Sequence, residues 1–399
     1  MRKNIFLRAL YDFANSIVMI VFLFYFSQRL VVERWVSEMR YNGSLIMSSI
    51  LFILIAPFIS KKTDQGASKI RWLRVYTILA FLLFGAVGLL TRFMPQHTLV
   101  ATILYAVSMT VYLICFLYYT PMLNDLATQW DHAKISWRGQ WVSSFGFVLW
   151  LIIMIPVASW SLWFLGTGRT APLLLAPMLF FVCALPMLLW YNAKDHPASP
   201  KEVAKQSIWK TLQHLISHKA VFLFLIAYFF YSDALLTFSS NYPLFLEKVH
   251  AIWDTQKSIL TAVILLFASL SAFFTGWWAD RVGLKKSLLW LLWAWCFVFP
   301  TFSFISWFRT LAVMSCIAGI LYWPTWSVSR ALFSKILPKH LTATWFSFFI
   351  ICERFSTLVW PLLRWALVTW LWWWVLWYKV ALVSMSILVF TWRVINKKV

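Results

Sequence analysis

The chain alternates long apolar runs with short polar segments along its whole length. Each run holds about the twenty residues that a helix needs to cross the hydrocarbon core of a bilayer. We therefore expect an all-α polytopic membrane protein with twelve transmembrane helices. The expected spans are residues 6–30, 43–60, 75–91, 99–121, 140–163, 172–191, 220–246, 257–278, 287–307, 310–328, 341–363 and 369–392.

The composition agrees with a membrane protein and argues against a soluble one. Of the 399 residues, 62% are hydrophobic and 12% are charged, whereas about 25% of the residues in a soluble domain are charged. The formal net charge is +22, which in a soluble protein would suggest a nucleic-acid partner. Here the cations lie mainly in the short segments between spans, so we expect a lipid bilayer as the surroundings and no nucleic acid.

The distribution of Lys and Arg also predicts the orientation. These residues gather on the cytoplasmic side of membrane proteins. With the N-terminus inside, the inner segments hold about three times as many of them as the outer segments. We expect both termini to lie in the cytoplasm.

The longest inner segment lies midway along the chain, between residues 191 and 219. Ser199 and Pro200 open a helix-start pattern, and apolar residues follow at helical spacing, which predicts an amphipathic helix on the inner face. This segment divides the chain into an N-terminal six-helix bundle (1–191), a cytoplasmic linker (192–219) and a C-terminal six-helix bundle (220–399).

A charged turn joins the eighth and ninth spans and reads Gly-Trp-Trp-Ala-Asp-Arg-Val-Gly-Leu-Lys-Lys (276–286). Gly283 permits a sharp reversal, since glycine adopts positive φ without steric cost. The pattern resembles the cytoplasmic loop motif of the major facilitator superfamily, which links the second and third helices of each six-helix half. A degenerate copy around Asp64 lies between the second and third spans. The resemblance implies the major facilitator fold and a gating loop made of Asp64, Gly276, Asp280, Arg281, Gly283, Lys285, Lys286 and Arg330.

Three acids lie within spans, where a charge is costly and calls for a reason. Asp12 shares a face of the first span with Asn15, and its structural alternative is an interfacial acid paired with Arg8 one turn earlier. We expect Asp12 and Asn15 to take part in coupling or in binding a solute.

Asp233 lies deeper, about 18 Å along the seventh span from Val221 at helical rise. Thr237 and Asn241 share its face, and a polar stripe at that depth faces protein or a water-filled cavity. The structural alternative is a buried acid bonded to a neighbouring helix. All three residues are candidates for binding the coupling ion or the solute.

A further acid, Glu353, lies in the eleventh span next to Arg354. Adjacent helical residues point to different faces, so we expect these two not to pair well. Lys379 in the last span reaches a similar depth, and we expect an intramembrane Glu353–Lys379 pair with a structural role.

Aromatic residues in two spans are candidates for lining a solute cavity. They are Tyr112 in the fourth span and Tyr322 and Trp326 in the tenth. Packing or contact with lipid is the alternative, because the chain holds 28 Trp and 36 Phe.

Several further stretches resemble the vacuole-effluxer branch of the superfamily, which includes the autophagy-related vacuolar amino-acid exporter and bacterial members. They are residues 10–16, 230–233, 329–338, 354–356 and 361–363, and they place Asp12, Asn15, Asp233, Asp280 and Arg330 at matching motif positions. The Asp-Phe-Ala start of the first span also resembles the cation-coupled sugar symporters, in which a first-helix acid takes part in cation coupling.

The sequence thus predicts a secondary active transporter that works by alternating access. The resemblance implies a small organic solute of the amino-acid class, a proton or sodium as the coupling ion, and symport across a bacterial cytoplasmic (inner) membrane. We expect no cofactor, metal site or enzymatic activity, because no nucleotide loop or catalytic constellation occurs and the His214–His218 pair has no third ligand near it. We also expect a monomer. Two alternatives stay open: a cation-coupled sugar-type symporter, and a transporter-like sensor or scaffold without flux.

Overall fold

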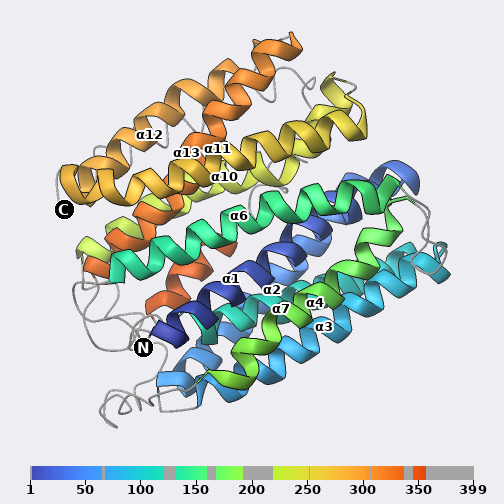
Figure 1. Cartoon of the computed structure of the whole chain (residues 1–399), viewed down its shortest axis with the longest axis horizontal. Helices are drawn as coiled ribbons and strands as arrows, with labels where there is room; N and C mark the ends of the chain where they lie inside the picture. Colours follow the sequence, from blue (N-terminus) through green and yellow to red (C-terminus); the bar gives the residue numbers. More distant parts are fainter. Residues whose placement is uncertain are drawn as a thin grey trace.

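The structure is a computed structural model of the whole chain. It describes residues 2–64, 68–120, 122, 132–159, 168–191, 219–250, 252–302, 304–305, 307–336 and 345–355. Within these ranges every regular element is a helix, and the long helices lie side by side along a common direction (Figure 1).

The first half of the chain forms six long helices. The first, α1 (Arg2–Val21), continues through two π-helical segments, η1 (Phe22–Phe26) and η2 (Arg29–Glu33). The others are α2 (Glu38–Asp64), α3 (Lys69–Phe93), α4 (Thr98–Tyr119), α6 (His132–Ser159) and α7 (Thr170–Trp190).

The second half contributes α10 (Lys219–His250), α11 (Asp254–Val282), α12 (Leu284–Thr301) and α13 (Phe308–Ile336), followed by a helix over residues 345–355. Among the described residues, 8 helices are long and apolar enough to cross a membrane. Part of the eleventh expected span and all of the twelfth lie outside the described residues, so the number of twelve stays a prediction.

The expected spans coincide with the observed helices, but the helix ends differ. α2 continues to Asp64 through Lys61 and Lys62, and α13 continues to Ile336 beyond Arg330. Hydropathy marks where a helix leaves the hydrocarbon core, whereas backbone hydrogen bonding continues into water. The apolar runs therefore locate the described spans and underestimate α2 and α13, whereas α12 ends at Thr301, short of the expected residue 307.

Two separate hydrophobic cores hold the helices together. One is built around Tyr11, Phe84 and Tyr105 of α1, α3 and α4. The other is built around Trp295 of α12 and Phe333 of α13. Residues 192–218, with the expected linker helix and bundle boundary, lie outside the described residues, so the division into two bundles stays a prediction.

α6 and α11 pack against each other and join the two groups of helices. In Figure 1, α6 runs through the middle of the view, with α1, α3 and α4 toward one side and α11 to α13 toward the other. α6 also packs closely on α1, where the indole nitrogen of Trp150 donates to the Phe13 carbonyl at 3.1 Å.

Tyrosine hydroxyls join the first and fourth helices of each group. In the first, Tyr112 and Tyr119 of α4 donate to backbone carbonyls of α1 at 3.1 and 3.0 Å. In the second, Tyr231 of α10 shares a hydrogen bond of 2.7 Å with Ser329 of α13. The same pairing of helices by the same chemistry fits a repeated architecture.

Glycine allows α3 to approach α7 closely. A Cβ atom on Gly88 would lie 2.7 Å from the backbone oxygen of Leu173, whereas one on Gly85 of the same helix would meet nothing within 4 Å. A backbone oxygen cannot move aside as a side chain does, so a methyl group at position 88 must separate the helices.

We therefore expect Gly88→Ala to lower the free energy of unfolding by about 1–3 kcal/mol, the usual cost of overpacking. Gly85→Ala is the matched control and should leave stability equal or raise it by up to about 1 kcal/mol, since alanine favours helix. Thermal unfolding in detergent measures both. Equal stabilities of the two variants would contradict the close contact.

Candidate functional site

Charged and polar side chains gather where α1 and α4 face α10, α13 and the 345–355 helix. We call this group the central cluster. It consists of Arg8, Asp12, Asn15, Tyr112 and Tyr119 from the first half of the chain, and Tyr228, Arg330, Glu353 and Arg354 from the second.

On the first side, Asp12 is half-buried within electrostatic range of the guanidinium groups of Arg8 and Arg330. The Arg8 guanidinium stacks over the Tyr119 ring at 4.8 Å. Asp12 also packs against α6, where its Oδ2 lies 2.5 Å from the position that a Cβ on Gly139 would occupy. Glycine at position 139 thus leaves room for the carboxylate.

Asn15 lies one turn further along α1 and is only 4% exposed. Neither its amide nitrogen nor its amide oxygen has a hydrogen-bond partner among the described residues. The Tyr112 hydroxyl donates to the Asn15 backbone carbonyl and leaves the side chain unused. A buried amide without partners costs about 1–3 kcal/mol per group, so its presence here suggests a role in binding.

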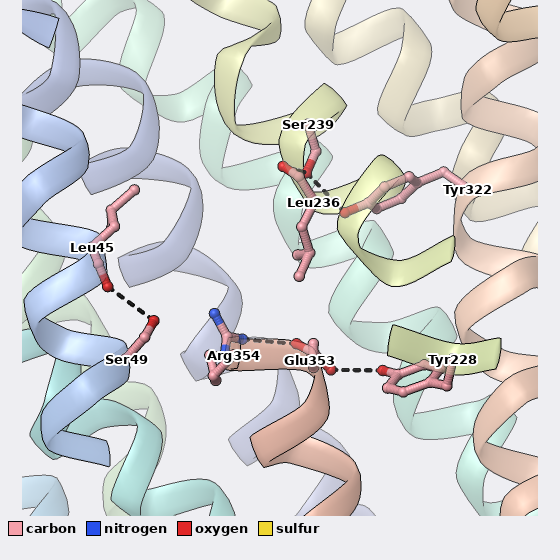
Figure 2. A network of polar contacts seen from close by, with 8 residues as sticks. All are labelled: Leu45, Ser49, Tyr228, Leu236, Ser239, Tyr322, Glu353 and Arg354. Atoms are coloured by element: carbon pink, nitrogen blue, oxygen red, sulfur yellow. Dashed lines mark hydrogen bonds and ion pairs between the residues drawn. The ribbon is translucent and has the colours of Figure 1, made fainter. Parts of the chain in front are cut away.

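On the second side, Glu353 is 7% exposed and accepts two hydrogen bonds (Figure 2). Tyr228 of α10 donates to its Oε2 at 2.8 Å, and Arg354 donates from Nη2 to its Oε1 at 2.8 Å. The acid is therefore held between a phenol and a guanidinium.

The pairing of Glu353 with Arg354 corrects the expectation that these neighbours would not pair well. Their Cα–Cβ bonds diverge around the helix, but the long arginine side chain folds back until its guanidinium reaches the carboxylate. Lys379 lies outside the described residues, so the expected Glu353–Lys379 pair stays a prediction.

Two interactions connect the halves of the cluster. Asp12 of α1 lies within electrostatic range of Arg330 of α13, and Tyr112 of α4 lies within that of Arg354. Figure 2 shows the Glu353–Arg354 pair lying between α10 and the blue ribbons of the N-terminal helices. Two arginines from the second half of the chain thus lie within electrostatic range of an acid and a phenol from the first half.

Asp233 of α10 has a buried Oδ1 without a hydrogen-bond partner among the described residues. The structural alternative, in which it bonds a neighbouring helix, therefore finds no support at that atom. The side chains of Thr237 and Asn241 lie outside the described residues, so the predicted polar stripe stays a prediction.

The aromatic candidates of α13 pack beside the cluster. The Tyr322 hydroxyl donates to Ser239 Oγ of α10 at 3.0 Å (Figure 2). Trp326 is 4% exposed, and its ring centroid lies 5.8 Å from that of Tyr228. These residues align α10 with α13 next to the acid–arginine pair.

Sequence reasoning missed Trp323, which also contacts both halves. Its ring stacks on Phe147 of α6 at 5.4 Å, and its buried indole nitrogen has no hydrogen-bond partner among the described residues. Pro324 follows directly within α13. A Trp-Pro step in the middle of a span was the available signal, since proline interrupts helical hydrogen bonding.

The charged turn has the predicted geometry at its glycine. α11 ends at Val282 and α12 begins at Leu284, with Gly283 alone between them at φ 93°. Arg281 is exposed, and its guanidinium stacks on Trp277 at 3.9 Å.

The two acids of the expected gating loop are not tested by this geometry. The side chains of Asp64 and Asp280 lie outside the described residues, and so does any contact between Asp280 and Arg330. Lys285 and Lys286 lie in the first turn of α12. The gating role of these residues stays a prediction.

Comparison with known proteins identifies the family. A model of proteins described as "Vacuole effluxer Atg22 like" matches residues 37–394. The chain belongs to this vacuole-effluxer family. The branch expected from the motifs of the first and seventh spans is therefore confirmed.

Two relatives of this family member are described, respectively, as a transporter and as an autophagy-related protein. It is 24% identical over 384 residues to an uncharacterized MFS-type transporter, YxiO, of Bacillus subtilis, covering 89% of this chain and 86% of the relative. It is 29% identical over 187 residues to Autophagy-related protein 22 of Kluyveromyces lactis, covering 44% of this chain and 37% of that protein.

Solved structures agree on the fold. A bacterial homologue of the iron transporter ferroportin, in an outward-facing state, superposes with a TM-score of 0.71 at 15% identity over 99% of this chain and 98% of that one. The nucleoside transporter NupG gives 0.68 at 15% identity over 98% and 99% of the two chains. The expected major facilitator fold is confirmed, and this vacuole-effluxer member is a multi-pass membrane transporter rather than an enzyme.

Proposed function

We propose that this vacuole-effluxer member is a secondary active transporter for small zwitterionic solutes of the amino-acid class. It works as a monomer by alternating access and couples transport to a proton or sodium in symport. The solute binds at the central cluster between the two bundles. The observation that carries the proposal is the buried, unpartnered amide of Asn15 beside acids and arginines of both halves.

The chemistry of the cluster fits a zwitterion. Arg330 and Arg354 offer guanidinium groups that bind a carboxylate through paired hydrogen bonds. Asp12 offers a carboxylate to an ammonium group, and Asn15 offers both a donor and an acceptor. A solute with both charges can interact with groups of both signs at once, whereas a neutral sugar offers no charge to either.

The contacts between halves support alternating access. Arg2 begins α1 and Ile336 ends α13, so Asp12 and Arg330 lie toward the same end of antiparallel helices. With both termini on the cytoplasmic side of a bacterial inner membrane, that end lies toward the cytoplasm. We propose that the Asp12–Arg330 interaction closes the inner side and breaks when that side opens, aided by the loop around Asp280 and Gly283.

Each remaining candidate has a place in this scheme. Asp233 binds and releases the coupling ion, with Thr237 and Asn241 on its face. Tyr112, Tyr322 and Trp326 border the solute, and Glu353 orients Arg354.

Flux measurements test the proposal. Purified protein in vesicles carrying an imposed proton or sodium gradient should take up radiolabelled amino acids and exchange them in counterflow. Uptake of sugars in place of amino acids would favour a sugar-type symporter. Thermal stabilisation by amino acids without any flux would favour a sensor.

Asn15→Ala tests the solute site. A hydrogen bond to a charged group contributes about 1.5–3 kcal/mol, so we expect the KM for amino-acid uptake to rise about tenfold to a hundredfold. Thermal stability should stay the same or rise, because the substitution removes a buried amide that the protein does not satisfy.

Ser16→Ala is the matched control, since the Ser16 hydroxyl bonds the Phe13 carbonyl of its own helix at 2.7 Å. Its KM should change by less than about twofold. An unchanged KM in the Asn15 variant would place the solute elsewhere.

A further inference from the structure

A small, shallow recess, open to the outside, lies at the end of α1 that is farthest from the N-terminus. It forms where η2 meets the connection between α3 and α4. Its lining includes Arg29, Arg34, Met94, Pro95, His97 and Thr98. The central cluster contributes no residue to it, so the recess is separate from the proposed solute site.

The lining is basic. Arg29 pairs with Glu33, and Glu33 also accepts an interaction from Arg169 at 3.5 Å. One acid thus serves two arginines, and the structure pairs no described acid with Arg34. The start of α4 at Thr98 adds to the same sign, because a helix N-terminus carries partial positive charge, and the neutral His97 ring offers an N–H donor. The recess therefore favours an anion.

The arginines around the recess are an exception to the charge distribution of the chain. In the proposed orientation this end faces outward, where Lys and Arg are scarce. Of the few outer cations, most belong to this end of the N-terminal bundle, namely Arg29, Arg34, Arg40, Arg92 and Arg169. Topology does not account for them, and Glu33 accounts for only Arg29 and Arg169 among them.

Exposed apolar side chains surround the recess. Trp35 is 89% exposed, Phe93 70%, Met94 51% and Leu99 56%. Aromatic residues of this kind gather at the level of lipid headgroups. A basic recess beside such residues lies at the depth where phosphate groups of lipids are found.

We propose that this recess binds a phosphate ester, with a membrane phospholipid as its source. The Arg34 guanidinium binds two phosphate oxygens, a geometry that suits arginine. His97 donates a further hydrogen bond, and Arg29 contributes its charge from beside Glu33. The acyl chains of the lipid lie along Phe93, Met94 and Leu99.

Thermal unfolding of the full-length protein in neutral detergent tests the proposal. Short-chain phosphatidylglycerol, short-chain phosphatidylcholine and inorganic phosphate are titrated separately. We expect phosphatidylglycerol to raise Tm in a saturable manner, phosphatidylcholine to do so more weakly, and inorganic phosphate to act only at far higher concentration.

Substitutions locate the site. Arg34→Gln and His97→Gln should each raise the phosphatidylglycerol concentration at half-saturation about tenfold. Arg309→Gln removes an exposed arginine from the first turn of α13 and is the matched control, with a change of less than about twofold. If inorganic phosphate raised Tm at the same concentration as the lipid, the ligand of the recess would be a soluble phosphate rather than a phospholipid.

Two results would overturn the proposal. The first is equal stabilisation by all additives or by none. The second is a lipid response that Arg34→Gln leaves unchanged. Because the readout is lipid binding, neither result depends on whether the protein transports amino acids.

Discussion

Replacing Asp233 by Asn should abolish gradient-driven accumulation of solute while leaving exchange of solute across the membrane. The Oδ1 atom of Asp233 is buried in α10 without a partner among the described residues. The asparagine side chain has nearly the same shape, but it neither binds a proton nor carries the charge that attracts sodium. The substitution therefore removes coupling and keeps the architecture.

The expected size of the effect follows from the gradient. A tenfold gradient of one coupling ion supplies about 1.4 kcal/mol, which sustains about tenfold accumulation of solute. In vesicles carrying such a gradient, the wild-type protein should approach that ratio and the Asp233→Asn variant should remain near onefold. Counterflow, which needs no gradient, should persist within about threefold.

Two controls separate coupling from damage to the fold. Asp233→Glu keeps a carboxylate and should retain part of the accumulation. Ser232→Ala removes a hydroxyl that bonds the Phe229 carbonyl of its own helix at 3.1 Å, and should behave as wild type. Undiminished accumulation by the Asp233→Asn variant would indicate that the coupling ion binds at Asp12 or at another acid.

The fold was within reach of the sequence because the length of an apolar run decides whether a helix spans a bilayer. The spans were predicted from these runs, and the turn was predicted from Gly283. Both features depend on residues that are close together in the chain. The ends of α2 and α13 were not predicted, because hydropathy does not report where a solvated helix stops.

The contacts of the central cluster were less predictable. Asp12 and Asn15 could be selected because polar residues are rare in a span, but the approach of Arg330 to Asp12 depends on how distant helices pack. The hydroxyl of Tyr112 bonds a backbone carbonyl, and a carbonyl has no signature in the sequence. The Glu353–Arg354 pair was excluded wrongly, because helical spacing describes Cβ directions and not the reach of an arginine.

In the proposed mechanism, the cluster links solute binding to conformation through shared groups. Arg330 and Arg354 lie within electrostatic range of Asp12 and Tyr112 across the two halves, and the same arginines are the proposed partners of a solute carboxylate. A bound solute that takes over these arginines weakens the contacts that close one side. A ligand shifts a conformational equilibrium only by its differential affinity for the two states, and this competition is one source of that difference.

Breaking the Glu353–Arg354 pair should produce the largest loss of stability. Removing one member of a buried ion pair leaves the other charge uncompensated and costs about 3–5 kcal/mol. We expect Glu353→Gln and Arg354→Gln each to lower the free energy of unfolding by about this amount. Glu353→Gln also weakens the acceptor of the Tyr228 hydroxyl.

The double variant Glu353→Gln/Arg354→Gln should be more stable than either single variant, because no unpaired charge remains buried. Groups that interact directly show coupling energies of about 0.5–3 kcal/mol, and we expect a value near the upper end. Chemical unfolding in detergent, followed by tryptophan fluorescence, measures all four proteins of the cycle.

Glu33→Gln is the control at a more exposed ion pair, since Glu33 is 31% exposed and faces Arg169 at 3.5 Å. Partly exposed pairs contribute about 0–1 kcal/mol, so its effect should be several times smaller. A double variant no more stable than the singles would show that Glu353 and Arg354 are stabilised by other partners. If Lys379→Gln then lowered stability as much as Arg354→Gln, Lys379 would be the main counterion of Glu353, as its depth in the last span predicts.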